Sequence, residues 1–175
     1  MAMLTLLVGC HAKPPPLPPV ETSDYLLGPG DRIRIITFGG QELTGEFRVN
    51  DSGDIAVPLI GTVHAAGLTS KQLAQTLERS LSQSHLYKNP SVSVEVVAYR
   101  PIFVLGEVNK PGQYPYQPGM TVLTAVAIAG GFTYRAVDDS FSIVRSVGGQ
   151  AVEGAGTRET VVQPGDVITV YERFF

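Results

Sequence analysis

The sequence predicts an α+β protein built from two small, β-rich modules, each with one main helix. Its 175 residues suffice for one domain or two small ones, and 43% hydrophobic with 17% charged residues is typical of a folded chain. Its 19 glycines and 13 prolines favour many short strands joined by tight turns over a helical bundle. Two helix-like segments, one in each half of the chain, follow a threonine suited to cap a helix.

The first ten residues form an apolar segment that ends in Leu7-Val8-Gly9-Cys10. This ending resembles the bacterial lipobox, in which a signal peptidase cuts before a cysteine that then carries lipid. The resemblance implies a lipid anchor at Cys10, and because His11 and not aspartate follows, it implies the outer membrane. No Lys or Arg precedes the run, which is short for a signal core; a start codon placed too far downstream would account for both. The alternative is an apolar N-terminus with an inert thiol.

Residues 11–23 are predicted to form a proline-rich tether. They contain Pro14-Pro15-Pro16-Leu17-Pro18-Pro19, which favours the polyproline II helix. At about 3.1 Å per residue, this tract would form a semi-rigid spacer of roughly 19 Å. We expect the spacer to hold the folded part of the chain away from a membrane surface. A ligand for a proline-reading domain is the alternative.

The first module is predicted over residues 24–99. It opens with the turn Gly28-Pro29-Gly30-Asp31 and a strand that has Ile33 and Ile35 on one face. Residues 46–57 then contain two short strand-like runs around Asn-Asp-Ser-Gly, a sequence that predicts a turn. We therefore expect these two runs to form a hairpin.

The best helix signal in the chain follows a further short strand at residues 61–64. Thr69 and Gln72 have the spacing of a capping box. Three leucines then recur every four residues and predict one buried stripe: Leu73, Leu77 and Leu81. The module closes with a strand over residues 91–98, which has Val92, Val94 and Val96 on one face.

The second module is predicted over residues 100–175. A strand at 102–108 is followed by the turn Asn-Lys-Pro-Gly, a short strand and a second Pro-Gly turn. Residues 122–129 predict a helix with Thr121 as its N-cap and Gly130 in the left-handed conformation just past its end. This helix is apolar on every side, so we expect it to be buried all round.

The remaining part of the second module has a less regular pattern. Residues 140–145 predict a strand, and residues 146–157 predict a glycine-rich, mobile loop. The closing segment Gln163-Pro164-Gly165-Asp166 and the strand after it echo residues 28–35. We interpret both as the same local motif, a turn from which a strand begins, and not as a duplicated domain.

Both modules resemble known domains. The first resembles the polysaccharide biosynthesis/export domain. The motifs that carry this resemblance are, in order, a Gly-Pro-Gly-Asp strand, an Asp-x-Gly hairpin, Pro58-Leu59-Ile60-Gly61-x-Val63, a Gly-Leu-Thr helix and an Asn-Pro-x-Val-x-Val strand. In the second, Val104-Leu105-Gly106-Glu107-Val108-x-Lys110-Pro111-Gly112-x-Tyr114 and the Pro-Gly-Met-Thr and Ala-Gly-Gly-Phe sequences resemble the SLBB domain, a soluble-ligand-binding β-grasp module. Between Arg145 and Gln163 the helix-like stretch of the β-grasp pattern is missing. Together the modules resemble the outer-membrane polysaccharide export family.

No catalytic or metal-binding signature stands out, and we predict no cofactor. The histidines His11, His64 and His85 lie far apart in the sequence, without metal-ligand spacing. The pair Asp138-Asp139 is interpreted as a solvated turn and not as a pair of catalytic acids. A net charge of −3, with scattered Lys and Arg, gives no basic surface for nucleic acid.

Aromatic residues cluster in the second module: Tyr114, Tyr116, Phe132, Tyr134 and Phe141. Aromatic faces are the surfaces on which sugar rings stack, but a chain without tryptophan also builds its core from such residues. We interpret most of them as core and retain Tyr116 and Tyr134 as possible contacts to a glycan.

The family resemblance implies a subunit of an exopolysaccharide or capsule export complex, anchored by lipid to the outer membrane on its periplasmic side. It implies a homo-oligomeric ring that conducts polysaccharide without catalysis, an inner-membrane copolymerase as a partner, and a separate outer-membrane barrel or another pore. Only residues 172–175 follow the last predicted strand, which is typical of the family's short members, without the C-terminal helix of the large capsule exporters. The alternatives are a monomeric periplasmic glycan-binding module and an enzyme acting on polysaccharide, which would need paired carboxylates.

Overall fold

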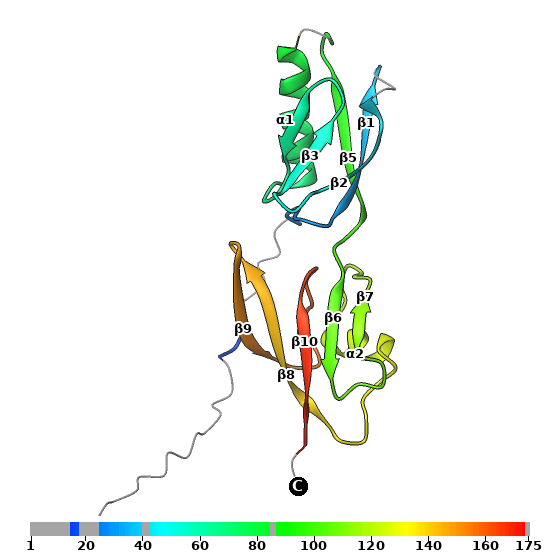
Figure 1. Ribbon diagram of the computed structural model, residues 1–175, viewed down its shortest axis with the longest axis vertical. Coiled ribbons are helices and arrows are strands. Elements are labelled where there is room, and N and C mark those ends of the chain that lie inside the picture. Colours follow the sequence, from blue (N-terminus) through cyan, green and yellow to red (C-terminus); the bar gives the residue numbers. More distant parts are fainter. Residues whose placement is uncertain (1–14, 18–24, 40–42, 85–86, 174–175) are drawn as a thin grey trace, which may run out of the picture.

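The computed structural model describes residues 15–17, 25–39, 43–84 and 87–173, and it has the α+β fold that the sequence predicts. Two β-rich units lie end to end, each with one helix, and the chain passes from the first to the second between β5 and β6 (Figure 1). Each unit has its own cluster of buried apolar side chains. Among the described residues, no helix combines the length and the apolar character that crossing a bilayer requires.

The first unit contains a three-stranded antiparallel sheet, a separate hairpin and one helix. Its elements are β1 (Arg32–Phe38), β2 (Gly45–Arg48), β3 (Asp54–Val57), β4 (Gly61–His64), α1 (Ser70–Gln83) and β5 (Ser91–Ala98). The sheet has the order β2-β1-β5, so β5 lies at an edge. The hairpin pairs β3 with β4.

Local sequence signals account for most of this unit. Thr69 and Gln72 form the predicted capping box, in which each side chain accepts a hydrogen bond from the other residue's backbone N–H. The predicted leucine stripe of α1 is buried against the sheet, and the inward residues of β1 and β5 alternate with exposed ones. The core is therefore a helix stripe packed on one face of a sheet.

The predicted hairpin over residues 46–57 is wrong. A turn does form there, because the Asn50 side chain accepts hydrogen bonds from the backbone of Ser52 and Asp54. The strands on either side of it diverge, however: β2 pairs with β1, and β3 pairs with β4. The turn signal is local and correct, but each strand pairs with its neighbour on the other side along the chain, β2 with β1 and β3 with β4.

The second unit is a five-stranded sheet with one short helix. Its elements are β6 (Ile102–Gly106), β7 (Gly112–Tyr114), α2 (Val122–Ile128), β8 (Ala136–Val147), β9 (Gln150–Gly156) and β10 (Val167–Glu172). The strand order is β7-β6-β10-β8-β9, and only the β6–β10 pair is parallel. At Gly106, φ is 82° and an added Cβ would lie 2.1 Å from the Val170 carbonyl oxygen, so only glycine fits this close approach.

Two predictions for this unit need correction. The predicted mobile loop at residues 146–157 is mostly β9, which pairs with β8 through a tight turn at Gly148 and Gly149. Helix α2 has the predicted N-cap at Thr121, but it is not buried all round, because Leu123 is 46% exposed and Ile128 43% exposed. The helix packs on the sheet along one side only, so its apolar outer side remains open.

The described part of the proline-rich segment is not a free spacer. Pro16 forms an isolated bridge with Ala155 of β9, and the Ala155 N–H donates to the Pro15 carbonyl oxygen at 2.7 Å. Leu17 packs against the core of the second unit, in space that Gly154 leaves open. Residues 15–17 therefore lie against the outer edge of β9 (Figure 1), where the sequence predicts a stand-off spacer.

Candidate functional site

Two turns of the same construction face the junction between the units. They are formed by residues 28–31 and 163–166, and in each the aspartate Oδ2 accepts a hydrogen bond, 2.8 Å long, from the backbone N–H three residues earlier. In each the glycine before the aspartate has a positive φ. The structure thus confirms that the two Pro-Gly-Asp sequences each form the same kind of local turn. Each turn begins a strand, β1 after the first and β10 after the second.

Both turn aspartates are buried, and each is paired with an arginine. Arg145 on β8 donates to Asp166 from Nε at 3.0 Å and from Nη2 at 2.6 Å. Arg100 donates to Asp31 from its backbone N–H at 2.8 Å and from Nη1 at 3.4 Å. Asp31 and Asp166 are both 0% exposed. The sequence shows that these aspartates border turns, but it does not show that they are buried.

Arg100 links the two turns. While Nη1 contacts Asp31 in the first unit, Nε donates to the Pro164 carbonyl oxygen in the second unit at 3.0 Å. The guanidinium group fits closely against the first turn, because a Cβ added to Gly28 would lie 2.1 Å from Nη1. One side chain therefore joins two structurally equivalent turns and sets how the units meet.

A row of three tyrosines crosses the same junction. The ring centres of Tyr25 and Tyr99 are 4.9 Å apart, and those of Tyr99 and Tyr116 are 5.3 Å apart, both edge to face. The Arg100 guanidinium carbon lies 5.7 Å from the centre of the Tyr25 ring, and the Tyr25 hydroxyl donates to Asp31 at 2.7 Å. Aromatic pairs of this geometry contribute beyond the area they bury. The row and Arg100 together form one continuous contact between the units.

Two tyrosines of the row have raised pKa values. Burial, and after it the hydrogen bond to Asp31, raises the pKa of Tyr25 far above its ordinary value. Burial and then the neighbouring Tyr99 raise the pKa of Tyr116. Both phenols therefore remain neutral over the pH range in which free tyrosine begins to ionise.

These shifts predict a loss of stability in alkali. Above about pH 10 the unfolded chain releases its tyrosine protons while the folded protein keeps them, so the free energy of unfolding falls as pH rises. We expect urea midpoints to be steady below about pH 9 and to fall by pH 11. The variant Tyr25→Phe should show a shallower fall. An equally steep fall in that variant would exclude Tyr25 as the cause.

The structure places the three residues predicted as site residues as follows. Cys10 lies outside the described residues. Tyr116 is half-buried and joins the junction through Tyr99. Tyr134 is 89% exposed after α2, and within the described ranges no ring contact connects it to the tyrosine row. Sequence analysis missed Tyr25, Tyr99 and Arg100, although the repeated Pro-Gly-Asp sequence marked both turns that Arg100 joins.

The acidic and histidine residues form no metal site in the part of the chain that the structure describes, where no three His, Cys, Asp or Glu side chains gather. Asp138 and Asp139 belong to β8 and not to a solvated turn, and Asp138 pairs with Arg158. His64 lies 2.7 Å from Asp54 across the β3–β4 hairpin. Asp138, His64 and Asp54 thus have structural partners.

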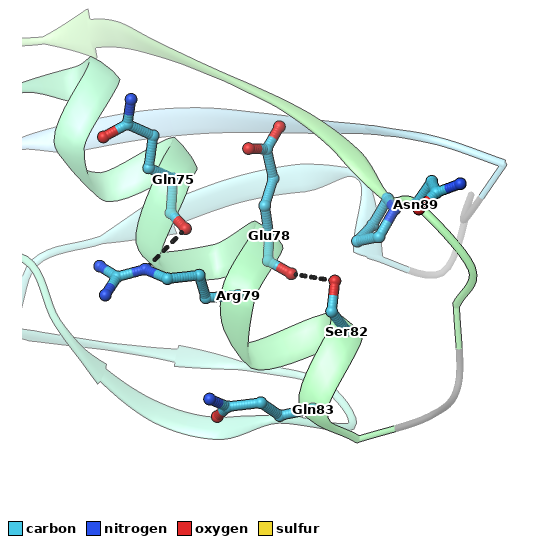
Figure 2. A pocket seen from close by; sticks show the side chains of 7 residues that line it. Gln75, Glu78, Arg79, Ser82, Gln83 and Asn89 are labelled. Atoms are coloured by element: carbon cyan, nitrogen blue, oxygen red, sulfur yellow. Dashed lines mark hydrogen bonds between the residues drawn. The ribbon is translucent and has the colours of Figure 1, made fainter.

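Two of the cavities in the described part of the chain lie beside α1. The larger has a volume of about 690 Å³ and lies at the C-terminal half of α1 (Figure 2). Its lining is polar, and helix contacts already engage much of it: Arg79 donates to the Gln75 carbonyl, and Ser82 donates to the Glu78 carbonyl. The smaller, about 470 Å³, lies at the other end of α1 beside Tyr25 and Tyr99. Only the smaller cavity has aromatic rings in its wall.

Two family models match this chain in succession. The model for polysaccharide biosynthesis/export proteins matches residues 19–97, and the model for the SLBB domain matches residues 101–156. The chain thus carries a polysaccharide biosynthesis/export domain followed by an SLBB domain. Tyr99 and Arg100 fall between the two matched segments, at the junction described above.

Curated relatives of this chain have names that describe polysaccharide production, export and transport. An exopolysaccharide production protein, ExoF, of Rhizobium meliloti (strain 1021) is 34% identical over 122 residues, which are 63% of this chain and 29% of the relative. The EPS I polysaccharide export outer membrane protein EpsA of Ralstonia solanacearum is 30% identical over 155 residues, 82% of this chain and 41% of the relative. The polysialic acid transport protein KpsD of Escherichia coli is 27% identical over 148 residues, 70% of this chain and 26% of the relative.

The chain therefore spans between 26% and 41% of the length of these three relatives. The names of the matched family model and of these relatives describe the production, export and transport of polysaccharide, and none of them names an enzymatic reaction. The comparisons thus agree with the resemblance of both modules.

Proposed function

We propose that this protein is a periplasmic subunit of an exopolysaccharide or capsule export complex, held at the outer membrane by lipid on Cys10. Copies assemble into a ring, and the polymer passes through its lumen without any covalent bond being made or broken. The order of the two family matches and the outer-membrane name of the relative EpsA support this proposal. An inner-membrane copolymerase delivers the polymer, and a separate outer-membrane barrel or another pore receives it.

The observation that carries the proposal is the fixed junction between two unlike modules. Closing a ring requires a heterologous contact, in which one face of each copy meets a different face of the next. Arg100 and the tyrosine row join the modules, so that each copy presents two different surfaces in a set relation. On the outer face of β1, Ile36 is 42% exposed and Phe38 is 85% exposed, and a neighbouring copy would cover such side chains.

A gene deletion tests the export role. We expect the deleted strain to retain polymer inside the cell and to regain secretion when the gene is restored, as measured by polymer in the medium and in the cell fraction. A Cys10→Ala gene tests the anchor in the same strain, and membrane fractionation should then find the protein released. Unchanged secretion after deletion would refute the export role.

The size of the assembly separates this proposal from its main alternative. Intact protein extracted in mild detergent should elute from a sizing column as a large oligomer, and Phe38→Ser should shift it towards the monomer. Lys88→Gln, another exposed change in the same module, serves as the control. A monomeric wild-type protein that binds polysaccharide would instead favour a periplasmic glycan receptor.

A further inference from the structure

The small cavity beside Tyr25 and Tyr99 combines an aromatic surface with polar groups from two elements. Its volume of about 470 Å³ is within the range of small-molecule sites. Its wall includes the first turn of α1, at Thr69, Ser70 and Lys71, and the middle of β5, at residues 94–96. Residues that carry rings, hydroxyls, an ammonium group and a carboxylate thus line one open cavity.

The aromatic wall is held rigidly. Tyr99 stands edge to face between Tyr25 and Tyr116, and Tyr25 is further fixed by its hydrogen bond to Asp31. Little conformational freedom remains for a ligand to remove, which favours binding on this surface. The C–H face of a pyranose is the apolar surface that such a ring accommodates.

Lys71 and Glu95 supply a donor and an acceptor at the same cavity. Among the described residues, neither side chain has an ion pair or a hydrogen bond, and no ion pair joins the two. The charge of Lys71 does not stabilise α1, because the helix dipole disfavours a cation in the first turn. The first turn also has no acidic residue that could pair with this lysine. Both side chains are therefore available to hydroxyl groups of a ligand.

The edge of β5 adds main-chain groups. The Val92 N–H donates to the Glu78 carboxylate on α1, so it points away from β1 and towards the helix. Because strand residues alternate in direction, the N–H and C=O groups of Val94 and Val96 point to the same free edge, next to the cavity. A ligand there meets polar backbone as well as side chains.

From these features we propose that the cavity is a saccharide subsite, in which a pyranose residue of the exported polymer stacks on Tyr99 and hydrogen-bonds to Lys71 and Glu95. This proposal rests on the proposed export function and names the place where the polymer touches the subunit. The larger cavity of Figure 2 lacks an aromatic face and is not this subsite. The exposed Tyr134 does not line this cavity.

Nuclear magnetic resonance of the isotope-labelled full chain tests the subsite. The probe is the oligosaccharide mixture released by partial acid hydrolysis from the exopolysaccharide of the producing strain. We expect amide shifts at residues 69–71, 94–96 and Tyr99, with about tenfold weaker binding in Lys71→Gln and in Glu95→Gln. Lys110→Gln, an exposed change in the second unit, should bind like the wild type. Three results would overturn the proposed subsite: no binding, amide shifts confined to Tyr134 or to the larger cavity, or equal affinity in all variants.

Complementation of the deletion strain separates failure of the subsite from failure of the export role. If the wild-type gene restores secretion while the labelled protein shows no shifts at the cavity, the subsite is refuted and the export role stands. If deletion leaves secretion unchanged, the export role fails, whatever the titration shows. Reduced secretion with Lys71→Gln and Glu95→Gln, at wild-type protein levels, would support both.

Discussion

Asp166→Asn is expected to lower the free energy of unfolding by about 3–5 kcal/mol, the loss typical of removing one member of a buried ion pair. The substitution keeps the size of the side chain and its contact with the Gln163 N–H, but it leaves the Arg145 guanidinium without its counter-charge. Because the two side chains are only 5% and 1% exposed, neither can replace the lost interaction with hydrogen bonds to water. Urea denaturation measures the difference.

Two further variants make the measurement specific. Glu46→Gln removes the acid of the exposed Arg34–Glu46 pair and should cost less than about 1 kcal/mol. The double variant Arg145→Met with Asp166→Asn removes the orphaned charge and should recover part of the loss. If Asp166→Asn cost no more than Glu46→Gln, the buried pair would contribute no more than a surface one.

Arg100→Met is expected to loosen the junction as well as to destabilise the chain. The change removes the contact to Asp31 and the bond to the Pro164 carbonyl, so we expect a loss of about 1–3 kcal/mol. The tyrosine row and the bond from the residue-100 backbone N–H to Asp31 then remain, and the relative orientation of the units should vary more widely. Spin labels at Ser82 and Glu159, one in each unit, should report a broader distance distribution.

The matched control for this prediction is Arg79→Met. The Arg79 side chain bonds only within α1 among the described residues, so its loss should leave the distance distribution unchanged. Both labelling positions are exposed, and Cys10 is replaced by serine so that only the introduced cysteines react. An identical distribution in Arg100→Met and Arg79→Met would show that Arg100 does not fix the junction.

Sequence reasoning succeeded where the signal and the structure are close together in the chain. The capping box of α1 spans four residues, and each Pro-Gly-Asp turn closes on its own backbone. The alternation in β1 and β5 likewise follows from neighbouring residues alone. The fold class, both helices and most strand positions follow from such local features without reference to any tertiary contact.

One failure is local: residues 146–157 look like a loop because they are rich in glycine, but most of them pair with the preceding strand β8 across the turn at Gly148 and Gly149. The other failures depend on partners far along the chain. Arg145 falls in a predicted strand, yet its burial depends on Asp166, 21 residues later. The junction was missed for the same reason: Tyr25 and Tyr99 meet only when β1 and β5 pair.

The strand order of the second unit also determines when that unit can be completed during synthesis. Strand β10 lies at the centre of the sheet, between β6 and β8, although it is the last of the five strands to leave the ribosome. Until it emerges, β6 and β8 have no common neighbour, and each keeps an unpaired, apolar edge open to wrong partners. The first unit has no such delay, since all of its strands precede Tyr99. In newly made chains the first unit should therefore be folded while the second is still incomplete. Chaperones should bind to the incomplete second unit.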